Sequence, residues 1–422
     1  MTRPFHYHVL DHDKFDGVAA FGSVTLNVPL LPVRNVAQPG SQPKEFYSLV
    51  RDFAELRKEG VVKGIVDAGV TEVGTSSRGR SIPALKLGKG ARHKVIFTGA
   101  HHSREWVSVE IPYYVAEYLI RNYKEEPTTY KERLIKKLVD TRTIWFIPMV
   151  NPDGHDFTIT LDRMWRANRR TVHHPAMTIT RHWTSDGRLS RTLEAGGHTE
   201  VLDVEAGSAL GVDINRNYPT QEWGTETGKD GYAKTSRHPR DAGANSIWCG
   251  PSAGSEPETK AISDLMARER FRASITYHNY SQLLLYPDAA REDDFVIDVG
   301  QGMHSLINES AASPYTYQAG SALYETTGDS MDFSYEKSPG RPSFTPELRP
   351  PHEAPEHIRF SGLPEDQLEP CFKENLGAAL ALINCAGRDR APVNSTNTVI
   401  TGNMVDVAVR MNCWEVFKGW TP

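Results

Sequence analysis

The chain has 422 residues, of which 39% are hydrophobic and 24% charged, a composition typical of one large globular domain or two smaller ones. A formal net charge of -5 without a dominant basic tract argues against a nucleic-acid partner. No stretch approaches the roughly 20 apolar residues of a membrane span, so no membrane partner is expected. Four cysteines allow two disulfides at most. Cys371 and Cys385 share a predicted helix that would hold them about 21 Å apart, so they should not bridge each other.

Apolar runs and helical spacing predict the elements of the chain. In chain order these are a helix from Lys44, strand-like pieces at 65–70 and 82–87, a buried strand at 94–99, a helix after Val107 that Pro112 either starts or kinks, a buried strand at 143–150 closing on a turn at 151–154, a helix at 256–268, strands at 273–277 and 283–286, a helix at 294–310, a strand at 343–347 and a helix at 368–385. Apolar strands that alternate with helices predict a single-domain α/β fold. Its central twisted sheet would be mixed but mostly parallel, with helices on both faces.

Three segments stand outside this pattern. Residues 1–40 are irregular and carry many prolines and glycines, so we expect an N-terminal extension. Residues 171–209 are polar, irregular and rich in His, Thr and Gly, which predicts a surface insertion within the main domain at 41–387. Residues 388–422 turn polar again and are expected to form a C-terminal tail.

A His-x-x-Glu pair, His102 and Glu105, follows the strand at 94–99. Open α/β sheets bind ligands in the crevice at the C-terminal ends of their strands, and a spacing of three residues lets both side chains reach one ion. The pair alone is weak evidence, because a solvated histidine and a glutamate in the first turn of a helix give the same pattern. His101 is the alternative ligand. We favour His102 on spacing and expect His101 to make a supporting contact or none.

His278 and Glu347 also stand at the ends of predicted strands. A single histidine after an apolar run is more often structural, so His278 gains weight only from the other ligands. With His102 and Glu105 it makes a three-ligand zinc site that leaves a fourth position open for water. Glu347, a second carboxylate near that water, would complete a metal-assisted hydrolase.

Residue types suited to carboxylate and oxyanion recognition occur in two further runs. Met-Trp-Arg places Arg166 beside a large aromatic residue, and Val-Asp-Ile-Asn-Arg-Asn places Asn215 next to Arg216. Arginine binds carboxylates bidentately, and asparagine adds a neutral donor. Any one of these arginines alone is as well explained as a surface charge. A non-haem iron oxygenase also binds its metal through two histidines and a carboxylate. Such an enzyme would not need Asn215 and Arg216 or the additional carboxylate of Glu347.

Together these runs resemble the zinc metallocarboxypeptidases of the carboxypeptidase A/B type. The matching runs keep the family order over about residues 41–387: His-Ser-Arg-Glu-Trp (102–106), Met-Val-Asn-Pro-Asp-Gly (149–154), Met-Trp-Arg (164–166), Val-Asp-Ile-Asn-Arg-Asn (212–217), Gly-Pro-Ser-Ala-Gly-Ser-Glu-Pro-Glu-Thr (250–259), His-Asn-Tyr-Ser-Gln-Leu-Leu-Leu-Tyr-Pro (278–287), Gly-Asp-Ser-Met-Asp-Phe-Ser-Tyr (328–335) and Ser-Phe-Thr-Pro-Glu-Leu-Arg (343–349). The resemblance implies an exopeptidase that carries one Zn2+ and hydrolyses the C-terminal bond of peptides or proteins.

The resemblance also implies a role for each matching residue. The zinc ligands would be His102, Glu105 and His278, and the general base would be Glu347. Arg166 would polarise the scissile carbonyl, while Asn215, Arg216 and the mobile Tyr324 would clamp the C-terminal carboxylate of the substrate. Arg104 and Tyr280 would line the subsite for the residue before the scissile bond.

The preference for the C-terminal side chain depends on the floor of the pocket. Met331 occupies the position at which basic-specific members of the family carry an acid, which favours apolar or aromatic residues because a buried cation would lack a partner. Asp329 works against this preference, since a carboxylate nearby would also tolerate lysine or arginine. Ala289 leaves room. We therefore expect broad specificity with an apolar and aromatic bias.

The chain departs from the family pattern in three respects. The insertion is longer than usual, the N-terminal extension is too short for a folded inhibitory propeptide, and the disulfide common in secreted relatives has no matching pair. Since the first residues also lack the apolar core of a signal peptide, a cytoplasmic monomer is expected, with secretion as the alternative. Two other functions stay open. One is an inert peptide-binding homologue, and the other is the same fold acting on modified peptides or N-acyl amino acids.

Overall fold

The computed structural model describes residues 46–160, 162–170, 177–183, 189–195, 198–203, 211–225, 235–237, 246–354, 359–360, 363, 365–388 and 413–420. The N-terminal extension expected over residues 1–40 lies outside the described residues. None of the described helices is both long and apolar enough to cross a membrane.

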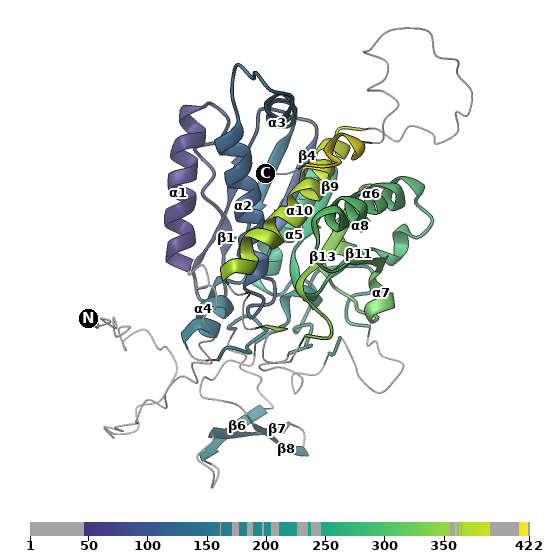
Figure 1. Cartoon of the computed structure of the whole chain (residues 1–422). Helices are drawn as coiled ribbons and strands as arrows, with labels where there is room; N and C mark the ends of the chain where they lie inside the picture. Colours follow the sequence, from purple (N-terminus) through teal and green to yellow (C-terminus); the bar gives the residue numbers. More distant parts are fainter. Residues whose placement is uncertain are drawn as a thin grey trace. The chain divides into compact units, whose positions relative to one another are not determined.

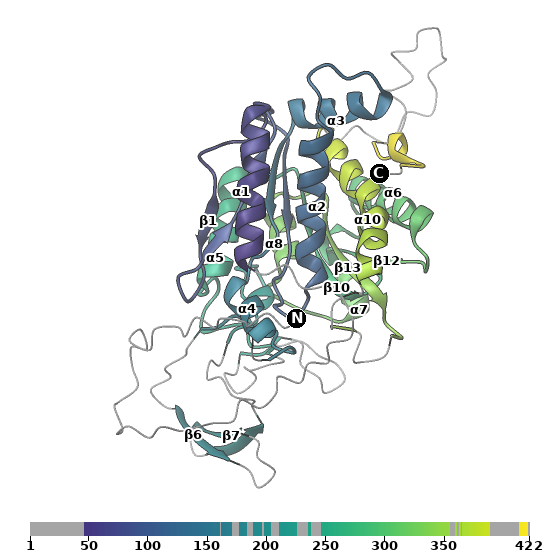
Figure 2. The same cartoon turned by 60° about the vertical axis from the view of Figure 1, so that its left-hand side comes forward.

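The described part of the chain alternates helices and strands (Figures 1 and 2). The helices are α1 (Phe46–Val62), α2 (Val107–Asn122), α3 (Tyr130–Thr141), α4 (Pro152–Thr160), α5 (Pro257–Glu269), α6 (Asp294–Ser310), α7 (Gly320–Leu323), α8 (Ser330–Lys337) and α10 (Glu365–Cys385), with short 3-10 turns η2 (Ile214–Arg216), η4 (Asp288–Ala290) and η5 (Glu415–Phe417). The strands are β1 (Glu72–Thr75), β2 (Ser81–Pro83), β3 (Leu85–Leu87), β4 (Lys94–Thr98), β5 (Thr143–Ile147), β6 (Met177–Trp183), β7 (Leu189–Ala195), β8 (His198–Asp203), β9 (Ala273–Thr276), β10 (His278–Ser281), β11 (Leu283–Tyr286), β12 (Thr316–Ala319) and β13 (Ser343–Pro351).

The central sheet has the order β12-β11-β13-β9-β4-β5-β3, and β10 pairs with β13 beside it. Most pairs are parallel, whereas β3 runs antiparallel to β5 and β11 antiparallel to β13. The mixed, mostly parallel α/β sheet predicted from the sequence is therefore confirmed. Parallel strands place their C-terminal ends at one edge, where the residues after β4 and β9 meet.

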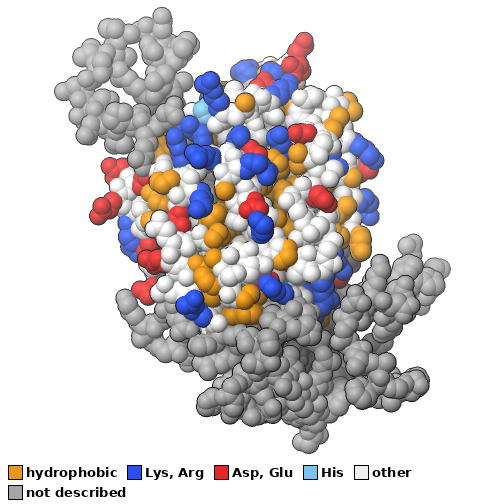
Figure 3. All heavy atoms as spheres, turned by 180° about the vertical axis from the view of Figure 1, so that it is seen from behind, with side chains coloured by type: hydrophobic (Ala, Val, Ile, Leu, Met, Phe, Trp, Pro, Cys, Tyr) orange, Lys and Arg blue, Asp and Glu red, His pale blue; other side chains and the backbone are white. Residues whose placement is uncertain are grey.

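Two apolar layers enclose this sheet. In β5, Ile144 and Phe146 pack with the helices α1, α2, α3, α6 and α10, while Trp145 and Ile147 pack on the other face with α5 and α8. This alternation follows from the period of two in a strand, and both faces are covered, so every residue of β5 is buried. Figures 1 and 2 show α1 and α2 side by side along the sheet. On the face drawn in Figure 3, basic, acidic and apolar side chains are interspersed.

Several local predictions are wrong. Residues 65–70 hold only an isolated bridge at Val66, not a strand. The turn predicted at 151–154 is the start of α4, because Pro152 fits the first helical position, where its missing N–H is not needed. Of the two alternatives left open for Pro112, a helix start at this residue is wrong, because α2 starts at Val107 and contains Pro112 in its second turn. The insertion expected to be irregular at 171–209 contains three antiparallel strands, β6 to β8, that pair with one another.

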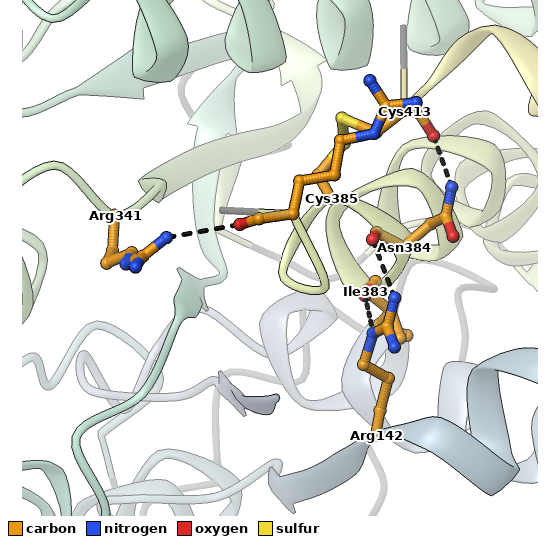
Figure 4. The surroundings of a disulfide bond; sticks show 7 residues. Arg142, Arg341, Ile383, Asn384, Cys385 and Cys413 are labelled. Atoms are coloured by element: carbon orange, nitrogen blue, oxygen red, sulfur yellow. Dashed lines mark hydrogen bonds between the residues drawn. A yellow bond between two sulfur atoms is a disulfide. The ribbon is translucent and has the colours of Figure 1, made fainter. Parts of the chain in front are cut away.

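The end of the predicted tail is joined to the main domain (Figure 4). Cys385, the last residue of α10, forms a disulfide with Cys413, whereas Cys371 is free and buried. The two cysteines of α10 therefore do not bridge each other, as expected. Asn384 donates from Nδ2 to the carbonyl of Cys413 at 2.8 Å. Arg142 donates to the carbonyls of Ile383 and Asn384 at 2.9 and 3.0 Å, which satisfies acceptors that the end of a helix leaves open. Residues 413–420 are therefore no free appendage.

Candidate active site

Three side chains from distant parts of the chain converge at the C-terminal edge of the sheet. His102 Nδ1 lies 2.8 Å from Glu105 Oε1, and His278 Nδ1 lies 2.8 Å from Glu105 Oε2. The two Nδ1 atoms are 3.0 Å apart. Ligand atoms about 2.0–2.2 Å from a tetrahedral zinc ion are separated by about 3.3 Å, so this spacing fits one ion between them. Among the described residues, this group is the one whose ligand atoms lie close enough together to hold a metal, all within 4.8 Å of one another.

The backbone after β4 explains how His102 reaches this position. A Cβ added to Gly99 would lie 2.0 Å from the carbonyl of Ser108, so only glycine fits where the chain passes α2. Ala100 then adopts a positive φ of 49°, an uncommon conformation outside glycine. Its amide is held by Ser108 Oγ at 2.9 Å. This tight turn directs residues 101–105 back over the ends of the strands.

Asp213 fixes the orientation of His102. Its Oδ1 accepts a hydrogen bond from His102 Nε2 at 3.2 Å, which leaves the Nδ1 lone pair free to face a metal. Its Oδ2 accepts from Arg166 Nε at 2.9 Å. Burial alone would raise the pKa of Asp213, but Arg166, His102 and Arg216 hold it well below the usual range. The carboxylate therefore stays charged and supports both neighbours. Asp213 was given no role from the sequence, although an acid between the apolar residues Val212 and Ile214 was a usable signal.

Glu347 reaches the cluster through strand register. His278 in β10 pairs directly with Glu347 in the parallel strand β13, and both residues line the same cavity. Partial burial raises the pKa of Glu347 to about 8, an effect that His278 opposes and Glu105 reinforces. The positive charge of a bound zinc ion would draw this pKa downward. Glu347 thus lies beside the cluster of His102, Glu105 and His278 but is not one of the candidate metal ligands.

The residues expected to clamp a carboxylate line the same cavity, whose volume is about 490 Å³. Asn215, held by a hydrogen bond from the Ser330 amide to its Oδ1 at 3.0 Å, places Nδ2 3.4 Å from His278 Nε2. The guanidinium of Arg216 donates to the carbonyl of Asn215 at 2.7 Å and lies 5.9 Å from the ring centre of Tyr324. Asn215, Arg216 and Tyr324 are therefore brought together within reach of the metal cluster.

Arg104 and Tyr280 meet outside the described lining of that cavity, at the ring of Phe360. The Arg104 guanidinium lies 4.1 Å from the centre of this ring, and the Tyr280 ring packs edge-on against it at 4.9 Å. Arg359 donates to the Tyr280 hydroxyl at 3.2 Å. Phe360 and Arg359 could not be predicted from the sequence because they lie in a segment without periodicity. The structure thus brings the two predicted subsite residues together on one aromatic platform.

The predicted specificity residues and His101 are placed as follows. Met331 and Asp329 line the cavity, whereas Ala289 is exposed in η4 and is not among the described residues that line it. His101 is fully buried, and its Nε2 lies 2.7 Å from the Tyr218 hydroxyl. His101 thus makes a supporting contact and stands outside the group of metal ligands.

Comparisons with known proteins identify the family of the chain. Residues 68–378 match the zinc carboxypeptidase family, so the chain belongs to that family. It is 29% identical to carboxypeptidase B of Rattus norvegicus over 326 residues, and 28% identical to metallocarboxypeptidase A of Arthroderma otae over 331 residues. Each alignment covers 74% of this chain and 64% of the relative. The chain thus spans less than two thirds of the length of these relatives.

Solved structures show the same fold. Bovine thrombin-activatable fibrinolysis inhibitor, in complex with tick carboxypeptidase inhibitor, superposes with a TM-score of 0.61 at 23% identity, covering 82% of this chain and 97% of that one. Carboxypeptidase A from Helicoverpa armigera gives a TM-score of 0.58 at 22% identity, covering 82% of this chain and 74% of that one. The family and the fold expected from the sequence are confirmed, and the histidine and glutamate cluster fits the single zinc ion of such a protein.

Proposed function

We propose that the chain is a zinc-dependent carboxypeptidase that releases single amino acids from the C-termini of peptides or proteins. The observation that carries this proposal is one cavity that holds two kinds of residue. His278 and Glu347, which belong to hydrolytic chemistry, line it together with Asn215, Arg216 and Tyr324, which suit a free carboxylate. An endopeptidase would have no use for a carboxylate clamp beside its metal.

His102, Glu105 and His278 would hold the zinc ion, which when bound acts as a Lewis acid toward water and a carbonyl oxygen. Asp213 keeps His102 in the tautomer that presents Nδ1 to the ion. Glu347 would take a proton from the attacking water and deliver it to the departing amine.

The remaining residues would bind and orient the peptide. Arg166, held by Asp213, would stabilise the developing oxyanion, a role often worth about 3 kcal/mol. Arg216 and Asn215 would hold the terminal carboxylate while Tyr324 closes over it. Arg104 and Tyr280 would contact the residue before the scissile bond.

The test is release of free amino acids from blocked dipeptides, compared with the same dipeptides amidated at the C-terminus. Amidation removes a buried charge-assisted contact of about 1.5–3 kcal/mol, so kcat/KM should fall about 10- to 100-fold or more. Removing zinc with a chelator should abolish release, and added zinc should restore it. Equal rates on free and amidated substrates would refute the exopeptidase assignment. Hydrolysis confined to modified peptides or N-acyl amino acids would favour the alternative substrate class, and binding without hydrolysis would favour an inert homologue.

We expected a cytoplasmic protein from the sequence, but the disulfide favours a different compartment. Disulfides persist in oxidising surroundings and are rare in the reducing cytosol. The Cys385–Cys413 bond joins two buried residues and closes a long segment of chain, features of a structural disulfide. We therefore propose that the protein works in an oxidising compartment.

A further inference from the structure

Hydroxyl side chains occupy four buried positions on the face of the sheet that α5 and α8 cover. Thr98 in β4 pairs in register with Thr276 in β9, and Ser274 in β9 pairs with Ser343 in β13. Each of the four is at most 2% exposed. Two residues before Thr98, the same face of β4 carries the apolar Ile96. A buried hydroxyl group costs free energy unless it is hydrogen-bonded, so the partners of these four groups matter.

The first pair connects the sheet to the start of α8, which packs against β9 and β13 (Figure 1). Thr98 Oγ1 donates to Thr276 Oγ1 at 3.0 Å, and Ser330 Oγ donates to the same oxygen at 3.2 Å. One hydroxyl oxygen can accept two hydrogen bonds. Ser330 is the first residue of α8. Thr98, Thr276 and Ser330 thus form a hydroxyl chain that holds the beginning of this helix on the sheet.

The backbone of Ser330 in turn orients Asn215. The Ser330 amide donates to Asn215 Oδ1 at 3.0 Å, and Asn215 Nδ2 lies 3.4 Å from His278 Nε2, a residue of the cavity wall. A carboxylate group accepts hydrogen bonds and donates none, so it needs Nδ2 and would be repelled by Oδ1. The direction of the Asn215 side-chain amide therefore depends on the position of Ser330.

The second pair holds the next residue of α8 separately. Ser274 Oγ donates to Ser343 Oγ at 2.8 Å, and Ser343 Oγ donates to the carbonyl of Met331 at 2.9 Å. Among the described contacts, Ser274 is bonded to neither Ser330 nor Asn215. Ser274 is therefore a matched control, because it belongs to the same strand as Thr276, is equally buried and lies outside the hydroxyl chain.

We propose that Thr98, Thr276 and Ser330 are positioning residues for the carboxylate clamp. The proposal rests on the proposed carboxypeptidase function. By holding the first turn of α8, the hydroxyl chain keeps the Ser330 amide against Asn215 Oδ1 and so keeps Nδ2 directed at the terminal carboxylate of the peptide. None of the three hydroxyl residues is among the described residues that line the cavity, so their effect on the substrate passes through Asn215.

The experiment removes the central hydroxyl group and measures selectivity for a free carboxylate. Thr276→Val keeps the shape of the side chain but loses the oxygen that accepts from Thr98 and Ser330. The ratio of kcat/KM for a free dipeptide to that for its amidated form should fall at least about 5-fold, mainly through a higher KM for the free dipeptide. Zinc content and cleavage of the amidated dipeptide should stay at the wild-type level. Thr276→Ser restores the hydroxyl group and should restore the ratio.

Further variants separate positioning from a general loss of stability. Ser330→Ala breaks the hydroxyl chain from the side of the helix and should lower the ratio as Thr276→Val does, and it alone decides if Thr276→Val does not fold. Ser274→Ala also loses a buried hydroxyl group and should keep the wild-type ratio, with urea unfolding as the measure of its stability. An unchanged ratio in the folded chain variants would overturn the proposal. An equal fall in Ser274→Ala would overturn it too, because selectivity would then follow the stability of the sheet.

The wild-type protein separates failure of this proposal from failure of the proposed function. Equal cleavage of free and amidated dipeptides by the zinc-loaded wild type would refute the exopeptidase and, with it, any clamp to position. Strong preference for the free dipeptide in the wild type and equally in Thr276→Val and Ser330→Ala would leave the carboxypeptidase intact and show that the hydroxyl chain is only structural.

Discussion

At the scale of single residues, the candidate site separates ligands from residues that support them. His102 and His101 are neighbours in the sequence, but only His102 faces Glu105 and His278. His101 turns to the Tyr218 hydroxyl instead. This difference was open in the sequence, where spacing alone favoured His102.

Zinc content should distinguish the two histidines. His102→Ala removes one of three ligands and should lose stoichiometric zinc, whereas His101→Ala should keep about one zinc per chain. Elemental analysis after dialysis measures both. Loss of zinc from the His101 variant with retention in the His102 variant would reverse the assignment of the ligand.

Asp213→Asn should weaken zinc binding without removing a ligand. Asparagine keeps the volume of the side chain but no longer provides the charged acceptor that orients His102 and holds Arg166. Loss of such a partner typically weakens metal affinity about 10- to 100-fold. Competition with a chromogenic chelator gives the zinc dissociation constant, and an affinity equal to that of the wild type would show that Asp213 does not position His102.

Glu347→Gln should separate metal binding from turnover. Glutamine keeps the shape of the side chain but accepts no proton from water. We expect normal zinc content and a kcat at least about 100-fold lower, within the usual range for loss of general-base catalysis. If turnover of a blocked dipeptide stayed near normal, the base would have to be another residue.

At the scale of elements, long apolar segments were predictable, but connections and packing partners were not. In segments such as 94–98 and 294–310 the spacing of the apolar residues predicts a strand and a helix. The structure has β4 and α6 at these positions. The start of α4 was missed because Asn-Pro-Asp-Gly favours a turn locally, while the residues after it continue as a helix. Phe360 was not singled out because its contacts with Arg104 and Tyr280 join parts of the chain that are distant in sequence.

The start of α5 contains a buried carboxyl pair that should make stability depend on pH. Asn168 Nδ2 donates to both Glu256 and Glu258, at 2.7 and 3.1 Å, and Ser77 donates its amide to Glu258 at 2.8 Å. Burial is the main cause that raises the pKa of Glu258, from 4.5 to about 7. The folded state therefore binds the proton more tightly than the unfolded state does.

The tighter binding of the Glu258 proton in the folded state contributes to the free energy of unfolding. This contribution is complete below pH 4.5 and is lost as the pH rises to about 7. A difference of about 2.5 pKa units corresponds to about 3 kcal/mol. Glu258→Gln cannot titrate, so its free energy of unfolding should fall less steeply over this interval. Urea unfolding at several pH values gives both slopes. Identical slopes would show that Glu258 does not keep its proton in the fold.

At the scale of the whole molecule, the disulfide links the end of α10 to residues near the C-terminus. The cysteines are 28 residues apart, and closing a loop of this length typically stabilises a fold by about 3 kcal/mol. A reductant should therefore lower the free energy of unfolding by about this amount. The Cys385→Ser, Cys413→Ser double variant should show the lower stability at once and no further effect of reductant. If reductant left the wild type unchanged, the bond would not contribute to stability.

The same bond decides what happens to the protein when its chain is cut. A protease that cleaves between Cys385 and Cys413 would leave the last residues tethered to the body of the protein through sulfur. Such a nicked molecule would migrate as intact protein on a non-reducing gel and release its terminal fragment only after reduction. Side chains near the C-terminus that pack into the core, such as Phe417, would then stay with it after the backbone is broken.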